Sequence, residues 1–324
     1  MRLLAAATTW RRAFVVVPGN LVSKPSDSCP QSPVIATVSI AGKIVLDSSV
    51  VRYNITCAQS AGGKVVLRGM YTDVHCHLLP GVDDGVESFK EAEAWLKRAR
   101  EENITRVIAT PHIRPDTYPN KPHELKHRFA ELCERAKDSG VELQLGAEVY
   151  YRHDLAEAIA KKEILTIGFG GRYLLVELPL AILPAGTEDV FYRLRLSGVE
   201  PVLAHPERYI FSRDEPMRLA ELAREGTLFQ ITTHSITGGF GGAVQRTAFR
   251  LLELGWVAVV ASDAHRLAAR PPMFREAVRV LANRYGRAAA RRLAVENPRR
   301  LFNGEHIEPV ACQPRRWRLG AFST

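Results

Sequence analysis

The sequence predicts an α/β fold built on a parallel sheet, beginning near residue 70. From there, short apolar runs alternate with amphipathic segments of helical period, seven times in succession. The runs are rich in valine and isoleucine, which is typical of parallel strands that helices cover on both faces. Over about 250 residues this order favours either a (β/α) barrel or an open doubly wound sheet.

The elements follow in a regular order. The expected strands span 73–75, 106–110, 142–145, 173–178, 200–204, 227–232 and 257–261. The expected helices span 88–102, 123–139, 154–161, 188–197, 215–225, 243–254 and 272–285, with Ser88 as the cap of the first. Neither GxGxxG nor GxxxxGK[ST] follows the first strand, which counts against a nucleotide-binding Rossmann or P-loop domain.

The composition is that of an ordinary globular enzyme. The chain has 324 residues, of which 46% are hydrophobic and 24% are charged. Its five cysteines are scattered without CxxC spacing, so we expect a reducing, cytoplasmic compartment rather than a disulfide framework. No apolar stretch reaches the roughly 18 residues of a transmembrane helix, so we expect no membrane insertion.

The net charge of +9 raises the possibility of nucleic-acid binding, so its distribution matters. Residues 1–69 carry eight lysines and arginines against two acidic residues, a net of +6, and the remaining residues carry only +3. The excess charge therefore belongs mostly to the leading segment and not to a groove of the folded part. We expect no nucleic-acid partner.

Residues 1–69 form an irregular N-terminal extension without a sustained helical period. The run from Arg11 to Val15 faintly resembles a twin-arginine export signal, but Pro18-Gly19-Asn20 interrupts the apolar stretch and no cleavage site follows. We expect a disordered leader or a miscalled start, with Met70 as the native start. Residues 304–324 are expected to form a tail, whose Arg315, Arg316, Trp317 and Arg318 are solvated rather than bound to an acidic partner.

The stretch YTDVHCHLLPGVDDG, residues 71–85, contains the first candidate metal ligands. On a strand, residues two apart point to the same face, so His75 and His77 project together. The carboxylates of Asp83 and Asp84 follow in the next loop. Alone, an HxH pair is more often structural than metal-binding.

Further candidate ligands stand just past later strands. They are His112 after the second strand, Glu148 after the third, His205 after the fifth, and Asp263 and His265 after the seventh. In a (β/α) barrel these carboxyl ends share one rim. Clustering such groups without a cation would cost desolvation and carboxylate repulsion, so together they predict a metal site.

The motifs DVHCH, TPH, GAE, AHPER and SDAH resemble the PHP (polymerase and histidinol phosphatase) superfamily of metal-dependent phosphoesterases. Within it, HLLPGVDDG and SDAHRLAARPP are similar to the capsule-type bacterial protein-tyrosine phosphatases. The resemblance covers residues 70–303. It implies a distorted seven-stranded (β/α) TIM-like barrel with three divalent metals, often manganese, with Fe, Zn, Co or Mg as other options.

The same resemblance implies roles for individual residues. One metal would be held by His75, His77, Glu148 and Asp263. Glu148 would bridge to a second metal, also bound by His205, and a third would be held by Asp84, His112 and His265. Arg208 and Arg270 match the family's phosphate-binding arginines and would act in both substrate binding and catalysis.

The function that the resemblance implies is hydrolysis of phosphotyrosine by a metal-activated water. The implied substrate is a bacterial tyrosine kinase that governs capsular and exopolysaccharide synthesis. Two alternatives stay open: a PHP phosphatase or phosphodiesterase acting on a small molecule such as histidinol phosphate, and a metal-binding module that docks on a kinase without turnover. Whether the chain self-associates is also open.

Four other features carry weaker expectations. Cys312 begins a Cys-x5-Arg pattern ending at Arg318, but its internal proline and nearby chain end exclude the phosphate loop of cysteine-based phosphatases. Glu177 is either a support of the site or part of the core edge. His234 and Ser235 either line the cleft or form a turn, and residues 238–242 are expected to be a flexible loop beside the site.

Overall fold

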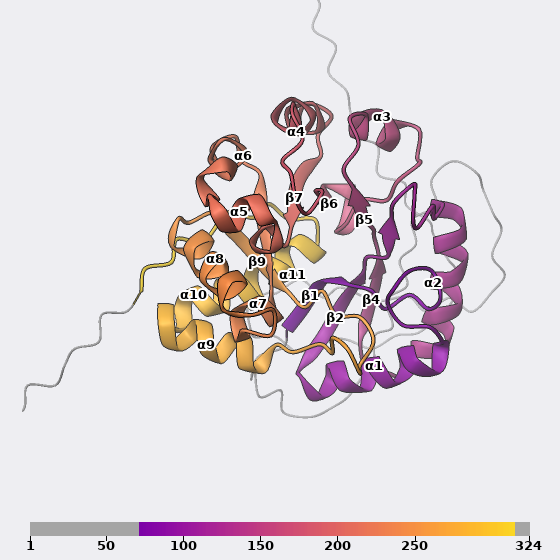
Figure 1. The fold of residues 1–324 in the computed structure, drawn as a ribbon. Coiled ribbons are helices and arrows are strands. Elements are labelled where there is room, and N and C mark those ends of the chain that lie inside the picture. Colours follow the sequence, from indigo (N-terminus) through magenta and orange to yellow (C-terminus); the bar gives the residue numbers. More distant parts are fainter. Residues whose placement is uncertain (1–70, 315–324) are drawn as a thin grey trace, which may run out of the picture. The chain divides into compact units, whose positions relative to one another are not determined.

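The computed structural model describes residues 71–314, and Figure 1 shows their fold. The predictions for the leader, for Met70 as the start and for the basic residues Arg315 to Arg318 lie outside the described residues. Every described helix is too short or too polar to span a bilayer.

The described strands form two sheets in which all pairings are parallel. One sheet has the order β1-β2-β4, from β1 (Tyr71–Cys76), β2 (Ile104–Ala109) and β4 (Glu142–Leu145). The other has the order β3-β5-β6-β7-β8-β9, from β3 (His112–Ile113), β5 (Glu148–Tyr150), β6 (Tyr173–Glu177), β7 (Glu200–Ala204), β8 (Leu228–Thr232) and β9 (Val257–Ala261). The predicted α/β fold with parallel strands is confirmed.

The described residues contain nine strands rather than the seven predicted, because a short further strand follows two of the expected ones: β3 comes after β2, and β5 comes after β4. Pro111 lies between β2 and β3 and has no N–H to donate to a sheet. Gly146 lies between β4 and β5, where an added Cβ would be 2.4 Å from Ile167 Cγ2. After Pro111 and after Gly146 the chain passes from the first sheet to the second. The two strands that follow, β3 and β5, lie side by side and pair His112 with Glu148.

The first and last strands meet without forming a regular ladder. They are joined by one isolated parallel bridge, Cys76 to Ala264, next to β9. The backbone N–H of Asp263 donates to His75 O at 2.8 Å, and that of His77 donates to Ala264 O at 2.8 Å. Among residues 71–314 the two sheets are therefore not closed by strand pairing, and a closed seven-stranded barrel stays a prediction.

Six of the predicted helices are present, and Figure 1 shows them outside the strands. They are α1 (Phe89–Glu101), α2 (Pro122–Ala136), α3 (Leu155–Ala160), α4 (Thr187–Leu196), α8 (Gly242–Glu253) and α9 (Arg275–Tyr285). Ser88 caps α1 as predicted, because its Oγ accepts a hydrogen bond from Glu91 N at 3.2 Å. The last helix begins later than expected, after the prolines at 271 and 272.

The one remaining predicted helix, 215–225, is divided into a 3₁₀ turn η3 (Pro216–Leu219) and α6 (Ala220–Arg224). Several short helices have too few residues to show a helical period in the sequence. They are η1 (Phe169–Gly171), η2 (Pro206–Arg208), α5 (Ile210–Asp214), α7 (Thr233–Thr237), α10 (Arg287–Arg291), the π-helix η4 (Arg292–Glu296) and α11 (Asn297–Phe302). Two of them, η2 and α7, border the site.

The strands separate two apolar clusters. The inner cluster joins side chains from both sheets, such as Val74, Ile108 and Leu175, with Phe302 of α11. The outer cluster packs the opposite strand faces against the helices, with Trp95 of α1 fully buried. Because apolar side chains cover both strand faces, the polar side chains of the candidate site gather at the strand ends.

Candidate active site

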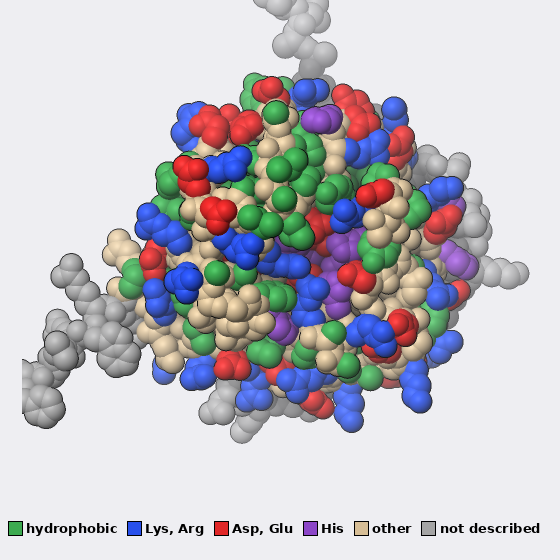
Figure 2. All heavy atoms as spheres, in the orientation of Figure 1, with side chains coloured by type: hydrophobic (Ala, Val, Ile, Leu, Met, Phe, Trp, Pro, Cys, Tyr) green, Lys and Arg blue, Asp and Glu red, His purple; other side chains and the backbone are tan. Residues whose placement is uncertain are grey.

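All of the predicted metal ligands meet at the C-terminal ends of the strands or in the loops that follow them. Figure 2 shows histidine side chains in the middle of this face, next to acidic side chains and bordered by lysines and arginines. The segments that supply them are far apart in the sequence and are brought together by the parallel order of the strands.

His75 and His77 point to the same place: His75 lies on β1, and His77 follows the last residue of β1, two positions further along the extended chain. The Nε2 atoms of both rings lie 3.3 Å from Glu148 Oε2. They also lie 3.4 Å from Asp263 Oδ1. All four side chains are buried. The structure thus brings together the residues expected for the first metal.

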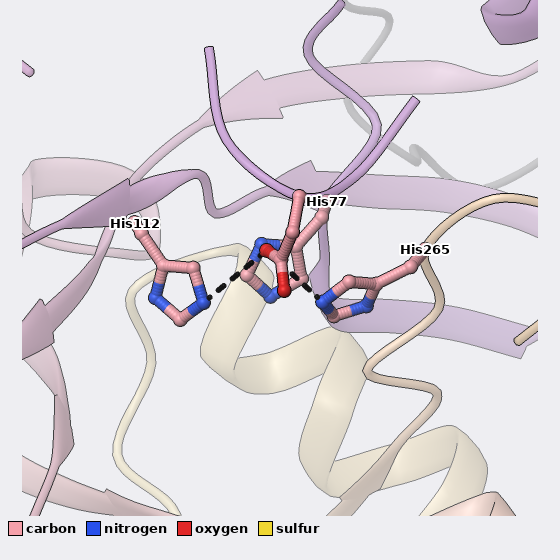
Figure 3. Close-up of side chains that lie close together, drawn as sticks. His77, His112 and His265 are labelled. Carbon is pink, nitrogen blue, oxygen red and sulfur yellow. Dashed lines mark ion pairs between the residues drawn. The ribbon is translucent and has the colours of Figure 1, made fainter. Parts of the chain in front are cut away.

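A second group forms around Asp84 in the loop after β1. His112 Nε2 lies 3.6 Å and His265 Nε2 lies 3.4 Å from Asp84 Oδ1. His77 joins them, so that one donor atom from each of these residues lies within 4.8 Å of the others. Figure 3 shows the rings of His77, His112 and His265 arriving from separate segments around one carboxylate.

A third group joins His205 and Glu177 to Glu148. His205 Nε2 lies 2.8 Å from Glu148 Oε1 and 3.8 Å from Glu177 Oε1. Glu177 also groups with His112 and Glu148 as a set of donors that fits a cation. The sequence analysis did not place Glu177 among the ligands, although it ends a strand as the other candidates do. The structure adds it to the candidate ligands.

Five of the donor atoms in these groups are buried and have no hydrogen-bond partner. Hydrogen-bond partners are absent for five buried ligand atoms of the described chain: His75 Nε2, His77 Nε2, His112 Nδ1, Glu148 Oε2 and Glu177 Oε2. Buried polar atoms in folded proteins nearly always have a partner. Imidazole nitrogens and carboxylate oxygens are the ligands of manganese, iron and zinc, so the residues fit divalent metals.

Two neighbouring residues orient the first two histidines. The Nδ1 of His77 is 2.8 Å from Asp83 Oδ2, and the Nδ1 of His75 is 2.9 Å from Gln230 Oε1. Since both oxygens accept a hydrogen bond from an Nδ1–H group, the Nε2 atom of each ring keeps a lone pair that faces the cluster. Asp83 was predicted only as a carboxylate of the loop, and Gln230, which is buried in the middle of the apolar β8 run, was not among the predicted site residues.

The charges of the site favour cations. Burial would raise the pKa of Glu148, but His75 and His112 hold that pKa well below its usual range. Burial likewise opposes ionisation of Asp263, and His75 and Arg270 keep its pKa well below the usual range. Both groups are therefore carboxylates at neutral pH. Burial lowers the pKa of His205 to about 4, so its ring is neutral and able to bind a metal.

The two predicted phosphate-binding arginines lie against the same carboxylate. Arg208 Nη1 donates to Asp263 Oδ2 at 2.7 Å, and Arg270 Nη1 donates to the same oxygen. Arg208 ends η2, the turn that follows His205. Asp263 therefore connects the arginines on one side to His75 and His77 on the other.

Ser235, His234 and Cys312 lie outside the three groups of candidate ligands. Ser235 is buried in the short helix α7 rather than in a turn, and its Oγ donates to Glu207 Oε1 at 2.7 Å. His234 is half-buried. Cys312 is buried and burial raises its thiol pKa to about 11, opposite to the low pKa of a nucleophilic cysteine.

We expect Asp83→Asn to weaken metal binding by about 10- to 100-fold, the usual effect of losing a carboxylate that orients a metal-binding histidine. Asp83 accepts from His77 Nδ1 and from the backbone of Gly85 and His112, and an amide cannot accept all three. Calorimetric titration with Mn²⁺ measures the effect. Asp116→Asn, at an exposed residue paired with Arg114, is the matched control and should bind like the wild type. Equal affinities in all three proteins would contradict the role of Asp83.

A family model described as capsular polysaccharide synthesis, CpsB/CapC, matches residues 71–303. The tyrosine-protein phosphatase YwqE of Bacillus subtilis (strain 168) is 33% identical over 254 residues, which cover 77% of this chain and 99% of that protein. The tyrosine-protein phosphatase CpsB of Streptococcus pneumoniae is 32% identical over 242 residues, covering 72% of this chain and 99% of that protein.

A solved structure has the same fold. It is one of the crystal structures of YwqE from Bacillus subtilis and CpsB from Streptococcus pneumoniae, which are described as unique metal-dependent tyrosine phosphatases. It aligns with a TM-score of 0.70 at 31% sequence identity and covers 76% of this chain and 99% of that chain.

Proposed function

Because the chain belongs to the CpsB/CapC family of capsular polysaccharide synthesis, we propose that it is a metal-dependent protein-tyrosine phosphatase. The observation that carries the proposal is the set of buried, unpaired nitrogen and oxygen donors that meet beside two arginines. Such a set binds cations and phosphate together, as a phosphomonoesterase requires.

The proposed metals are three divalent cations, with Mn²⁺ as the native ion. The proposed ligands are His75, His77, Glu148 and Asp263 for the first, Glu148, Glu177 and His205 for the second, and Asp84, His112 and His265 for the third. His112 Nδ1, 3.2 Å from Glu148 Oε2, also lies close enough to serve the second. When bound, such cations acidify water toward neutral pH and stabilise the charge of the phosphoryl group.

The chain's own residues complete the site. Arg208 and Arg270 bind the phosphate oxygens through charge-assisted hydrogen bonds, and the planar guanidinium fits two oxygens at once. Asp263 holds both arginines at the site, next to His75. A phenolate leaving group, with a parent pKa of about 10, needs little protonation compared with an alkoxide, so aryl phosphates are the favoured substrates.

The proposed substrate is a phosphotyrosine-bearing protein, a bacterial tyrosine kinase that governs capsular or exopolysaccharide synthesis, and the proposed location is the cytoplasm. The names of the relatives support phosphotyrosine as the reacting group, and the description of the matched family supports the link to capsular polysaccharide synthesis. The distorted barrel belongs to the same proposal. Its support is the bridge between Cys76 and Ala264, which links the first and last strands.

A comparison of three substrates tests the proposal. We expect the Mn²⁺-loaded protein to hydrolyse a phosphotyrosine peptide faster, in kcat/KM, than histidinol phosphate or a phosphodiester. A faster rate with histidinol phosphate would favour a small-molecule phosphatase, and a faster diester rate would favour a phosphodiesterase. Absence of turnover, with metal bound, would favour a module that docks without catalysis.

A further inference from the structure

The glycine run Gly238 to Gly242 carries one side chain, Phe240, and that side chain contacts both arginines of the site. The Cζ atom of Arg208 lies 5.0 Å and that of Arg270 lies 5.5 Å from the centre of the Phe240 ring. Both distances are within the range of a cation–π contact. Because the two guanidinium groups also share Asp263 Oδ2, each is held by one anion and one aromatic ring.

The backbone of this run is organised to present the ring. Gly238 and Gly241 have φ angles of 89° and 88°, which side-chain-bearing residues rarely adopt. Gly239 N donates to His234 O at 2.8 Å and Gly241 N donates to Gly238 O at 2.9 Å. The run thus forms a hydrogen-bonded turn between α7 and α8, beside the two arginines of the site, and its flexibility stays a prediction.

Two guanidinium groups that converge on one phosphate repel each other before the phosphate arrives. A ring face carries negative partial charge and offsets this repulsion without accepting their N–H donors. Asp263 offsets it too, but it occupies a donor on each arginine. Phe240 is therefore the contact that steadies the arginines while leaving their hydrogen-bonding edges to the ligand.

We propose that Phe240 is a positioning residue that holds Arg208 and Arg270 side by side, so that both bind the same phosphate group. The inference rests on the proposed function and extends it to a residue outside the metal cluster. Its ligand is a phosphate monoester dianion, and inorganic phosphate is the simplest probe.

The variant Phe240→Leu keeps an apolar side chain and removes the ring. We expect it to raise the KM for a phosphotyrosine peptide and the dissociation constant of inorganic phosphate by about tenfold, the size of two partly solvated cation–π contacts. Phe240→Tyr keeps the ring and should restore both values to within about twofold of the wild type. Calorimetry on the Mn²⁺-loaded protein gives phosphate binding without turnover.

Gln245→Ala provides a control for loosening of the turn. Gln245 Nε2 donates to Ile236 O at 2.9 Å and so fastens the segment without contacting either arginine. If the inference is correct, this variant binds phosphate like the wild type. Equal loss of phosphate affinity in Gln245→Ala and Phe240→Leu would assign the effect to the backbone and overturn the inference.

A double-mutant cycle locates the effect on the arginines. In an Arg208→Ala background, Phe240→Leu should change phosphate affinity by a smaller factor than in the wild type, because one of its two contacts is already gone. Full additivity would contradict the inference. Failure of the proposed function gives a different result. In that case the wild-type protein binds phosphate and Phe240→Leu still weakens that binding, but the wild-type protein does not hydrolyse phosphotyrosine.

Discussion

Replacing Glu148 with glutamine is expected to lower kcat/KM for a phosphotyrosine peptide by about 10³-fold, the size of effect typical when a key electrostatic group at a reacting centre is removed. The carboxylate lies within 3.3 Å of four imidazole rings, those of His75, His77, His112 and His205. No other acidic side chain of the described residues has as many histidine contacts at that distance. An amide removes the negative charge and turns an N–H donor toward the metal-binding atoms.

Metal analysis and steady-state kinetics on the same preparation measure this effect. We expect Glu148→Gln to lose bound metal along with activity. Glu142→Gln is the matched control, because Glu142 lies on the preceding strand and forms only a partly exposed ion pair with Arg106. Such pairs contribute about 0–1 kcal/mol, so the control should keep its activity. Wild-type activity in Glu148→Gln would remove the central residue of the proposed site.

Removal of the metals is expected to reduce activity to background and to lower the melting temperature by about 5–10 °C. At a free metal concentration near 100 Kd, one binding site stabilises the folded protein by about 2.7 kcal/mol, and each kcal/mol corresponds to about 2–4 °C for a domain of this size. Both effects should reverse when Mn²⁺ is restored. Dialysis against a chelator, followed by differential scanning fluorimetry and a peptide assay, measures them.

The variant Cys312→Ser tests whether the reaction depends on a cysteine nucleophile instead of on the metals. The thiol is buried and burial raises its pKa to about 11, so a nucleophilic thiolate is disfavoured there. The serine variant should keep its kcat and its sensitivity to the chelator. Loss of activity in the serine variant, together with activity that survives chelation in the wild type, would assign the chemistry to the cysteine.

Much of the site could be predicted from the sequence because each strand end is visible as an apolar run followed by a polar residue. The alternation expected of an extended chain was enough to place His75 and His77 on one face, and their Nε2 atoms do meet at Glu148 Oε2, although β1 itself ends at Cys76. The parallel order of the strands then implied that ligands after different strands share one end of the fold.

The parts that were missed depend on contacts between residues distant in sequence. Gln230 looks like an interruption in an apolar strand until its Oε1 is seen to accept from His75 Nδ1. Glu177 has no motif around it, and only its approach to His205 and Glu148 marks it as a candidate ligand. The turn around Phe240 reads as flexible in the sequence, because glycine permits many conformations.

The number of strands also differs from the prediction, because strand pairing is set by residues that are distant in the sequence. Whether an apolar run continues across Pro111 or Gly146 depends on which neighbour it pairs with, and a single sequence does not state the pairing. In the structure each run changes sheets at that point, and the two new strands pair His112 with Glu148. The interruptions thus help to assemble the site.

Anomalous diffraction from crystals grown with Mn²⁺ tests most directly whether distant imidazoles and carboxylates bind the catalytic metals together. We predict manganese peaks within about 2.0–2.3 Å of donor atoms of His77, Asp84, His112 and His265, and further peaks on both sides of Glu148. Protein that hydrolyses phosphotyrosine while no manganese peak lies within reach of Glu148 would contradict the account.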